Sequence, residues 1–477
     1  MTNLYTRGLM LSPVLLMLLM IDLHAQSFVY TDNNVVGPNS VTAFSVAGNG
    51  GLTNIGTFAT GGSGLGGFAF ASNRARTCTV GNRLYVANDG SNSVSGFDIN
   101  PVTGSLSLVP GSPFATGGAA GGSGISLDCT PNGNFLINTN GGTNNITVFS
   151  IAANGALTPV GGSPFAAGGI TPLGIKVAPS GQLLSVTLPS SDAIGMFSIG
   201  ANGALTPVLG SPFASPANGE AAGVDINCAS TFLYAANANL RGTSVDVFSI
   251  GPNGALTLVQ TSNNPSVGDN SNVGVLSPND QFLFVSNQFS DSVTVFDVAA
   301  NGIISLVAGS PFGGTGGIPC GIATNAAGTF LFGANYDNST VTSFSIAGNG
   351  ALTLVGSFGT GQSALSGLES LAVFPGKSCF TFDVCLQDDS NPSTVFLGNS
   401  QTGAYKFCCG GTVFTGVALV TRRGNIVTFQ DNPTDRRVLV TDDESAHVGK
   451  ASLQSPPGSI KCTITDRNTT NNSCACQ

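Results

Sequence analysis

The chain has 477 residues, a formal net charge of −9 and only 8% charged side chains, while 42% of its residues are hydrophobic. Charge so far below the usual quarter, combined with this hydrophobicity, excludes an intrinsically disordered chain. The acidic balance argues against nucleic-acid binding, which needs a basic footprint. The abundant glycine suits many short strands joined by tight turns.

The first residues have the layout of a signal peptide. Arg7 gives a positive start, an apolar run follows over residues 9–21, and Asp22 ends it. Ala25 is the small residue expected at a cleavage site, so residues 1–25 are predicted to be removed and the mature chain to begin at Gln26. The run is short for a membrane span, although an uncleaved anchor is the alternative. We therefore expect an exported protein (extracellular, periplasmic or on the cell surface) without a membrane span.

One pattern of three parts then recurs along the chain. Its first part is an apolar strand that runs into a polar turn, at residues 28–30, 84–88, 135–138, 183–186, 232–234, 282–285 and 330–332. Its second part is an alternating strand that closes on Phe44, Phe97, Phe149, Phe197, Phe248, Phe296 or Phe344. An alternation of period two, as in residues 292–297, predicts strand and not helix.

The third part of the pattern is a turn, usually Asn-Gly, followed by another strand. Its glycines are Gly50, Gly104, Gly155, Gly203, Gly254, Gly302 and Gly350, separated by 54, 51, 48, 51, 48 and 48 residues. Seven units of about fifty residues match the period of β-propeller blades. The Asn-Gly pairs predict two-residue hairpin turns in which both positions have positive φ.

A fourth strand precedes each first strand, as in residues 124–128, but is missing before Phe28. It reappears without a following partner at residues 368–373. The simplest account is that this late strand completes the blade begun at the N-terminus, which leaves no open sheet edge. The sequence thus predicts an all-β fold with a closed seven-bladed propeller over residues 26–378. An open array of hairpins is the alternative.

The cysteines are concentrated at the end of the chain. Seven fall in the last hundred residues (Cys379, Cys385, Cys408, Cys409, Cys462, Cys474 and Cys476), and four fall earlier (Cys78, Cys129, Cys228 and Cys320). In an exported chain this density predicts disulfides. Because seven is odd, one tail cysteine is free, pairs with the first region or pairs with another chain. Residues 379–477 are predicted to form a small cysteine-rich β domain, with strands at 394–397, 417–421, 426–429 and 437–440.

The repeat resembles the lactonase-like seven-bladed propellers, which include the propeller type of 6-phosphogluconolactonase, the carboxymuconate cyclases and the YVTN-repeat surface proteins. The likeness rests on residues 84–88, on Ser93 and Val94 with Phe97, and on the Asn-Gly-Ala-Leu turns, and it covers residues 26–378. It is specific for fold and says little of function, because function lies in a site and not in a scaffold. The lactonizing members use histidine, arginine and glutamate around the channel, whereas the two histidines here, His24 and His447, fall outside residues 26–378.

One register of charged residues stands out when the innermost strands are aligned on the strands that follow them. Arg76, Asp128, Lys176 and Asp225 fall at equivalent positions in successive units, where the other units have Val275, Ala323 and Ala372. These residues are predicted to line the channel. They form either a ligand cradle or, as we favour, inter-blade ion pairs of Arg76 with Asp128 and of Lys176 with Asp225.

Three further charges are predicted at the channel mouth. Glu220 and Glu369 lie in or at the entry to innermost strands, and Arg74 lies in the equivalent region. A glutamate and an arginine across a channel can serve as general base and oxyanion partner. They are equally consistent with ordinary loop charges.

Cofactor chemistry has little support in the sequence. The segments 88–92, 190–192 and 335–338 are rich in the oxygen ligands that calcium prefers. Turn chemistry explains their Asn, Asp, Gly and Ser residues equally well, and no loop has several carboxylates at ligand spacing. We expect no cofactor, with calcium as the alternative.

These observations predict a secreted or surface-associated binding module. The top of the propeller would present a surface to a protein, a glycan or a small molecule, and the tail would be an accessory domain. The alternative is a lactone hydrolase or lactonizing cycloisomerase that uses Arg74, Glu220 and Glu369 as a substituted channel site. A purely structural component of a wall or matrix is a third possibility.

Overall fold

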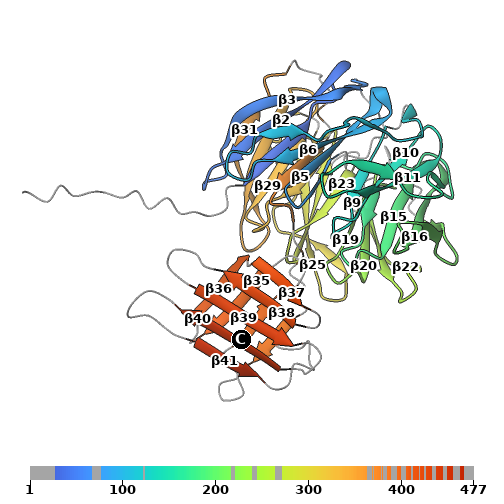
Figure 1. Ribbon diagram of the computed structural model, residues 1–477. Helices are drawn as coiled ribbons and strands as arrows, with labels where there is room; N and C mark the ends of the chain where they lie inside the picture. The colour runs from blue at the N-terminus through green and yellow to red at the C-terminus, as the bar shows by residue number, and fades with distance from the viewer. Residues whose placement is uncertain are drawn as a thin grey trace, which may run out of the picture.

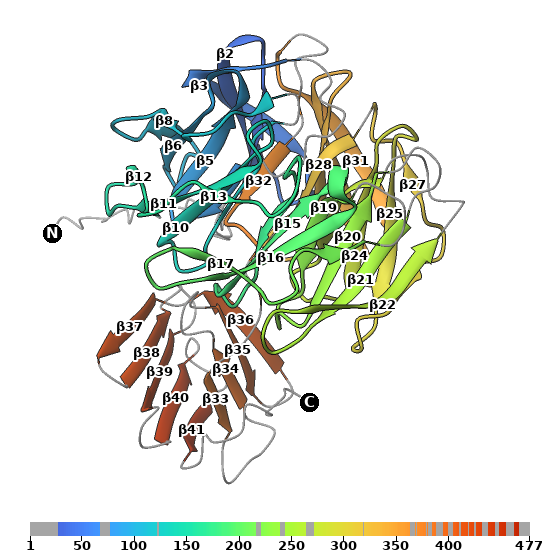
Figure 2. The same ribbon diagram turned by 90° about the vertical axis from the view of Figure 1, so that its right-hand side faces the viewer.

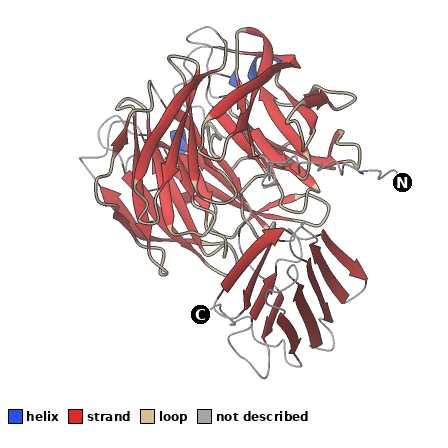
Figure 3. Cartoon of the chain, turned by 90° about the vertical axis from the view of Figure 1, so that its left-hand side faces the viewer, coloured by secondary structure: helices blue, strands red, loops and turns tan. Residues whose placement is uncertain are grey.

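The structure is a computed structural model. It describes residues 27–66, 77–121, 124–215, 221–238, 244–263, 271–317, 319–362, 368, 370–377 and 379, and the strands of the tail between 384 and 466. The segment predicted as a signal peptide lies outside these residues. The described chain is almost entirely strand and turn, with short 3₁₀ turns such as η1 (Asp89–Ser91) and η3 (Pro189–Ser191) (Figure 3). No helix within these ranges is long and apolar enough to cross a membrane.

Seven antiparallel sheets form the blades of a propeller (Figures 1 and 2), which confirms the predicted fold. From the innermost strand outward, blade A has β32 (Ser370–Phe374), β1 (Phe28–Asp32), β2 (Gly37–Val46) and β3 (Leu52–Gly64). Blade B has β4 (Thr77–Val80), β5 (Arg83–Asn88), β6 (Ser93–Ile99) and β7 (Leu106–Leu108), with β8 (Phe114–Ala115) also paired to β6. Blade C has β9 (Leu127–Cys129), β10 (Phe135–Asn140), β11 (Asn145–Ile151) and β12 (Leu157–Pro159), with β13 (Phe165–Ala166) paired to β11.

The remaining four blades follow the same order. Blade D has β14 (Ile175–Val177), β15 (Leu183–Leu188), β16 (Ala193–Ile199) and β17 (Leu205–Pro207), with β18 (Phe213–Ala214) paired to β16. Blade E has β19 (Ala221–Ile226), β20 (Phe232–Asn237), β21 (Ser244–Ile250) and β22 (Leu256–Asn263). Blade F has β23 (Ser271–Leu276), β24 (Phe282–Asn287), β25 (Ser292–Val298) and β26 (Ile304–Leu306), with β27 (Phe312–Gly313) paired to β25. Blade G has β28 (Pro319–Thr324), β29 (Phe330–Asn335), β30 (Thr340–Ile346) and β31 (Leu352–Gly359).

The ring is closed as the sequence predicts. The late strand β32 pairs with β1, the earliest described strand, in an antiparallel register that sets Tyr30 opposite Ala372. In blades B to G, each innermost strand runs toward the face that carries its turn to the second strand. We call this the lower face. The upper face carries the turns between second and third strands and the connections from one blade to the next.

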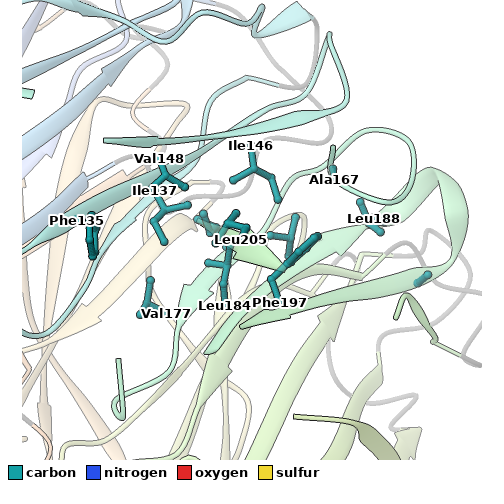
Figure 4. Close-up of a cluster of buried hydrophobic side chains, with 13 residues drawn as sticks. Phe135, Ile137, Ile146, Val148, Ala167, Val177, Leu184, Leu188, Phe197 and Leu205 are labelled. Carbon is teal, nitrogen blue, oxygen red and sulfur yellow. The ribbon is translucent and has the colours of Figure 1, made fainter. Parts of the chain in front are cut away.

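Among the described residues of the propeller, the hydrophobic core is divided into seven clusters, one between each pair of neighbouring blades. Figure 4 shows the cluster between blades C and D, where Ile137 and Val148 of one blade face Leu184 and Phe197 of the next. The middle strands of a blade are covered on both sides, which explains why β24 reads as a nearly continuous apolar run and is buried along its whole length. The predicted phenylalanines, which lie in the third strand of each blade (Phe149 in blade C and Phe344 in blade G, for example), are all buried at 2% exposure or less.

The Asn-Gly turns are hairpins, but the predicted two-residue geometry is wrong. In six blades the glycine N–H donates three residues back, as Gly155 does to the carbonyl of Ala152, and only the glycine has positive φ. This is a three-residue loop whose last position alone is left-handed. The asparagine side chain instead accepts from the backbone two residues on, as Asn154 does from the N–H of Ala156 at 3.1 Å.

Each turn glycine also marks an interface between blades. A Cβ added at Gly203 would lie 2.7 Å from the ring of Phe135, the first residue of the second strand in the preceding blade. The same relationship joins Gly50 to Phe330 across the closing interface between blades G and A. Glycine is therefore required at this position for two reasons: the turn needs a left-handed residue, and the preceding blade approaches too closely for a side chain.

The outer strands are of two kinds. In blades A, E and G the fourth strand is long and contains a register shift, whereas in B, C, D and F it is interrupted by a Ser-Pro-Phe corner with a cis peptide bond. At each such corner the serine hydroxyl accepts a backbone N–H of the third strand, as Ser211 does from Met196 at 2.8 Å. The hydroxyl thus replaces the ladder hydrogen bond that the interrupted strand does not supply.

The tail forms two further antiparallel sheets, which lie apart from the blades in Figures 1 and 2. One has β33 (Val384–Gln387), β34 (Val395–Gly398), β35 (Ala404–Cys409) and β36 (Thr412–Val417). The other has β37 (Leu419–Arg423), β38 (Ile426–Asp431), β39 (Arg437–Asp443), β40 (Val448–Gln454) and β41 (Cys462–Asp466). The run 417–421, predicted as one strand, is divided between β36 and β37, which belong to different sheets. Leu386, Phe396, Val438 and Val440 are fully buried.

Candidate functional site

Four of the predicted site residues lie outside the described residues. Arg74 and Arg76 fall between β3 and β4 in the chain, Glu220 directly precedes β19, and Glu369 directly precedes β32. The predicted catalytic roles of Arg74, Glu220 and Glu369 therefore stay predictions. All four positions belong to connections that lead from one blade into the innermost strand of the next.

The register proposed for Arg76 is wrong. In blade C the residue opposite Ile137 is Asp128, and in blade B the residue opposite the equivalent Tyr85 is Cys78. The prediction assumed equal turn lengths, but the turn from β4 to β5 pairs Val80 with Arg83 and leaves only two residues between them. This turn is two residues shorter than the corresponding turn of blade C. The residue at the position equivalent to Asp128 is therefore Cys78, two residues after Arg76 in the sequence. Cys78 forms a disulfide with Cys129 of the adjacent blade.

Asp128, Lys176 and Asp225 come together near the lower ends of three successive innermost strands. The ammonium group of Lys176 lies 3.4 Å from a carboxylate oxygen of Asp128 and 3.8 Å from one of Asp225. Lys176 therefore sits between two carboxylates, one on each neighbouring blade. Of the two predicted pairs, Lys176 with Asp225 is present in this geometry, while the described partner of Asp128 is Lys176 and not Arg76.

Both carboxylates also bind the backbone of the next blade. Asp128 accepts the N–H of its neighbour Cys129 at 2.9 Å and that of Val177 in blade D, also at 2.9 Å. Asp225 accepts from Ile226 at 2.9 Å and from Leu276 in blade F at 2.9 Å. Each carboxylate thus joins two innermost strands with its two oxygens, while lysine supplies the opposite charge.

The electrostatics follow from this arrangement. Burial alone would raise the pKa of the Asp225 carboxyl, but Lys377 and Lys176, aided by the two backbone N–H groups, hold that pKa below its ordinary value of 3.8. Burial would lower the pKa of Lys176, but Asp128 and Asp225 outweigh it and raise that pKa above 10.5. Asp225 and Lys176 are therefore ionised at neutral pH, and neither is poised to exchange a proton there.

Lys377 is a member of this group that the sequence reasoning missed. It follows β32 of blade A, and its ammonium group lies 3.3 Å from a carboxylate oxygen of Asp225 in blade E. Two residues further on, Cys379 forms a disulfide with Cys228, which follows β19 in the same blade E. The odd number of tail cysteines was a usable signal, since pairing with the first region was one of its stated explanations.

The upper ends of the innermost strands differ around the ring. Ile125, Leu173 and Ala222 of blades C, D and E are apolar and buried. On the other side Asn272, 2% exposed, donates to the side-chain oxygen of Gln288 at 2.8 Å, and Gln288 donates to the sulfur of Cys320 at 3.7 Å. No feature of the sequence indicated this series of hydrogen bonds. Gln288 lies in a turn of blade F, and Cys320 lies in the neighbouring blade G.

The segments considered for calcium are engaged in turns and strand pairing. Asn88 donates to the hydroxyl of Ser95 at 2.8 Å, and Asp89 accepts the N–H of Ile125 at 2.9 Å. Asn335 likewise donates to Thr342 at 2.7 Å. Within the described residues, no three His, Cys, Asp or Glu side chains are grouped as metal ligands would be. Calcium binding stays a prediction.

Comparison with known families gives one match, to the family described as "Lactonase, 7-bladed beta-propeller", over residues 36–218, 211–310 and 243–366. No curated relative matches the chain.

Solved structures share the fold at low sequence identity. A candidate 6-phosphogluconolactonase from Bacteroides fragilis is 20% identical with a TM-score of 0.60, and it covers 73% of this chain and 98% of its own. The periplasmic gluconolactonase of Pseudomonas aeruginosa is 17% identical with a TM-score of 0.59 and the same coverage. A candidate 6-phosphogluconolactonase from Bacteroides uniformis is 20% identical with a TM-score of 0.58, covering 69% of this chain and 95% of its own. At such identities the likeness shows the fold alone.

Proposed function

The chain belongs to the lactonase family of seven-bladed β-propellers, and on that scaffold we propose that it is an exported binding module, secreted or held at the cell surface. The upper face of the propeller presents the binding surface, made by the connections between blades. Its ligand is a protein, a glycan or a small molecule. The tail is an accessory domain attached to the lower face.

The main support for this proposal is that the channel charges contact one another and the backbone of neighbouring blades. Asp128 and Asp225 each give both oxygens to backbone N–H groups of two blades, and Lys176 neutralises them. These groups hold neighbouring blades together, so they are not free to act as acid, base or nucleophile. In such a ring the channel charges stabilise the contacts between blades. We infer that the ring acts as a rigid scaffold that holds a binding surface in place.

Export is part of the same proposal. Disulfides persist in oxidising compartments and are rare in the cytosol. The Cys78–Cys129 and Cys228–Cys379 bonds fit an exported chain, as does the predicted signal peptide over residues 1–25.

A second candidate is a lactone hydrolase or lactonizing cycloisomerase, and the family match favours it. On this view Glu220 or Glu369 acts as general base toward the ring carbonyl, and Arg74 stabilises the negative charge that develops on its oxygen. All three residues precede innermost strands in the chain.

Lactone hydrolysis distinguishes the two candidates. The purified mature protein, residues 26–477, is assayed against a panel of sugar lactones by titration of the acid released, with the Glu220→Gln and Glu369→Gln variants alongside. We expect no rate above spontaneous hydrolysis. Turnover by the wild-type protein overturns the binding-module proposal, and its loss in one of the variants would identify the base.

A further inference from the structure

The segment that leaves the last propeller strand is attached to the opposite side of the ring. This segment comprises Pro375, Gly376, Lys377 and Cys379, and we call it the latch. Its origin is β32 in blade A, whereas Lys377 pairs with Asp225 and Cys379 is bonded to Cys228, both in blade E. Blades A and E are not neighbours, because B, C and D separate them on one side and F and G on the other.

The latch therefore leads from blade A to blade E at the lower face. The five residue steps from Phe374 to Cys379 span at most about 17 Å. The start of this path is fixed against blade B, where the hydroxyl of Thr79 donates to the carbonyl of Val373 at 3.1 Å. A Cβ added at Gly376 would lie 2.8 Å from the same hydroxyl oxygen.

The strand from which the latch departs is the one that seals the ring. β32 lies far from the other strands of blade A in the sequence and meets them through the pairing of Phe28–Asp32 with Ser370–Phe374. Every other innermost strand is joined to its own second strand by a short turn, which keeps the pair together when it opens locally. β32 has no such turn, so its loss from the sheet is the route by which this ring opens most readily.

We propose that the latch is a lock on ring closure, in which the Cys228–Cys379 bond prevents β32 from leaving blade A. While the bond is intact, a detached β32 stays tethered within a few residues of its site and returns. Once the bond is broken, β32 is held by non-covalent contacts, which include its five residue pairs with β1, the hydrogen bonds from Thr31 and Thr79, and the Lys377–Asp225 ion pair. Cys228 and Cys379 are partly exposed, whereas Cys78 and Cys129 are 6% and 8% exposed. A mild reductant therefore reaches the latch bond before the bond between blades B and C.

Amide hydrogen exchange, read by mass spectrometry of peptides, tests the lock in the full mature chain. The Cys228→Ser/Cys379→Ser variant is compared with the wild type, and the rate for β32 and β1 is divided by the rate for β10 in the same sample. We expect this ratio to rise by roughly 30-fold or more, since loss of a native disulfide releases a constraint of that size. An unchanged ratio overturns the proposal.

The matched control is Cys78→Ser/Cys129→Ser, which removes a disulfide from blades B and C and leaves the latch intact. Its ratio for β32 to β10 is expected to stay at the wild-type value, and a rise equal to that of the latch variant would contradict a specific lock. If the latch variant does not fold, the control variant serves instead. Its latch is reduced under native conditions, the reduction is followed by differential alkylation of Cys228 and Cys379, and the same ratio is measured before and after.

Discussion

The hydroxyl of Tyr85 in blade B donates to the backbone carbonyl of Gly155 in blade C at 2.9 Å, although 70 residues separate them. Tyr30 makes the same bond to Gly104 at 3.0 Å, and Tyr234 makes it to Gly302 at 3.2 Å. A tyrosine of one blade thus binds the turn glycine of the next at three of the interfaces. These bonds join neighbouring blades directly, in addition to the apolar packing between them.

Replacing Tyr85 with phenylalanine removes this bond and leaves the buried carbonyl of Gly155 unsatisfied. We expect Tyr85→Phe to lower the free energy of unfolding by about 1 kcal/mol, measured by urea denaturation at pH 7. Tyr234→Phe is expected to behave alike. A loss below measurement error in both variants would show that packing alone sets the interface.

The same tyrosine makes stability depend on alkaline pH. Burial raises the pKa of Tyr85 from 10.0 to about 12, with a smaller opposing effect of Arg83. A raised pKa means that the contribution is complete below pH 10 and is lost as the pH rises toward 12. Wild-type stability should fall over that window, and Tyr85→Phe should show a shallower fall. Parallel curves for the two proteins would contradict this assignment.

Gly50 tests the double role of the turn glycines. It has φ of +83°, and a Cβ there would strike the ring of Phe330 across the interface that closes the ring. Gly50→Ala is expected to cost about 2 kcal/mol or more, from the left-handed backbone and the clash together. Gly48 lies in the same hairpin with open space around its Cβ position, so Gly48→Ala should change the unfolding free energy by about 0.5 kcal/mol at most. Equal costs for the two variants would refute the explanation.

Ser211 tests the corner that replaces a ladder bond. Its hydroxyl accepts the N–H of Met196, which lies in a strand covered on both sides. Ser211→Ala is expected to cost about 1–3 kcal/mol, because the N–H is left without a partner. The control is Ser198→Ala on the same strand, where the hydroxyl bond to Thr206 is exposed. Thermal unfolding of the two variants in parallel measures the difference, and a control as unstable as Ser211→Ala would count against the corner.

Asp225 tests the channel charges. Its side chain is 6% exposed and faces both Lys176 and Lys377, so Asp225→Asn is expected to cost about 3 kcal/mol at pH 7. Because its pKa is held below 3.8, the contribution is complete above that pH and is lost as the pH falls below it. The difference between wild type and variant in urea unfolding should thus be constant from pH 7 to 5 and shrink below pH 3.8.

Asp98→Asn is the control for that experiment. Asp98 pairs with Arg83 at 3.2 Å but is 53% exposed, and exposed pairs contribute little. Its removal should change stability by about 0.5 kcal/mol or less at every pH. A cost for Asp225→Asn no larger than this would show that the channel charges are incidental to the ring.

The repeat could be predicted from the sequence because each of its features depends on residues that are close together in the chain. The apolar strands, the buried phenylalanines and the turn glycines each follow from a few consecutive residues, and their spacing alone predicted seven blades and the pairing of β1 with β32. The type of turn was misjudged, since Asn154 satisfies the backbone through its side chain and leaves only Gly155 left-handed. The alignment of Arg76 with Asp128 was also misjudged, because a shorter turn before Arg83 gives the equivalent position to Cys78.

The class of fold, the number of blades and the way the ring closes follow from the order of residues along the chain, because strand period and turn chemistry act over short stretches. Which charges meet depends on how the blades are arranged in space. Lys377 pairs with Asp225, which lies 152 residues earlier in the sequence. Cys379 forms its disulfide with Cys228. Such contacts depend on where distant strands end around a common axis, and a register shift of two residues in one turn is enough to change them.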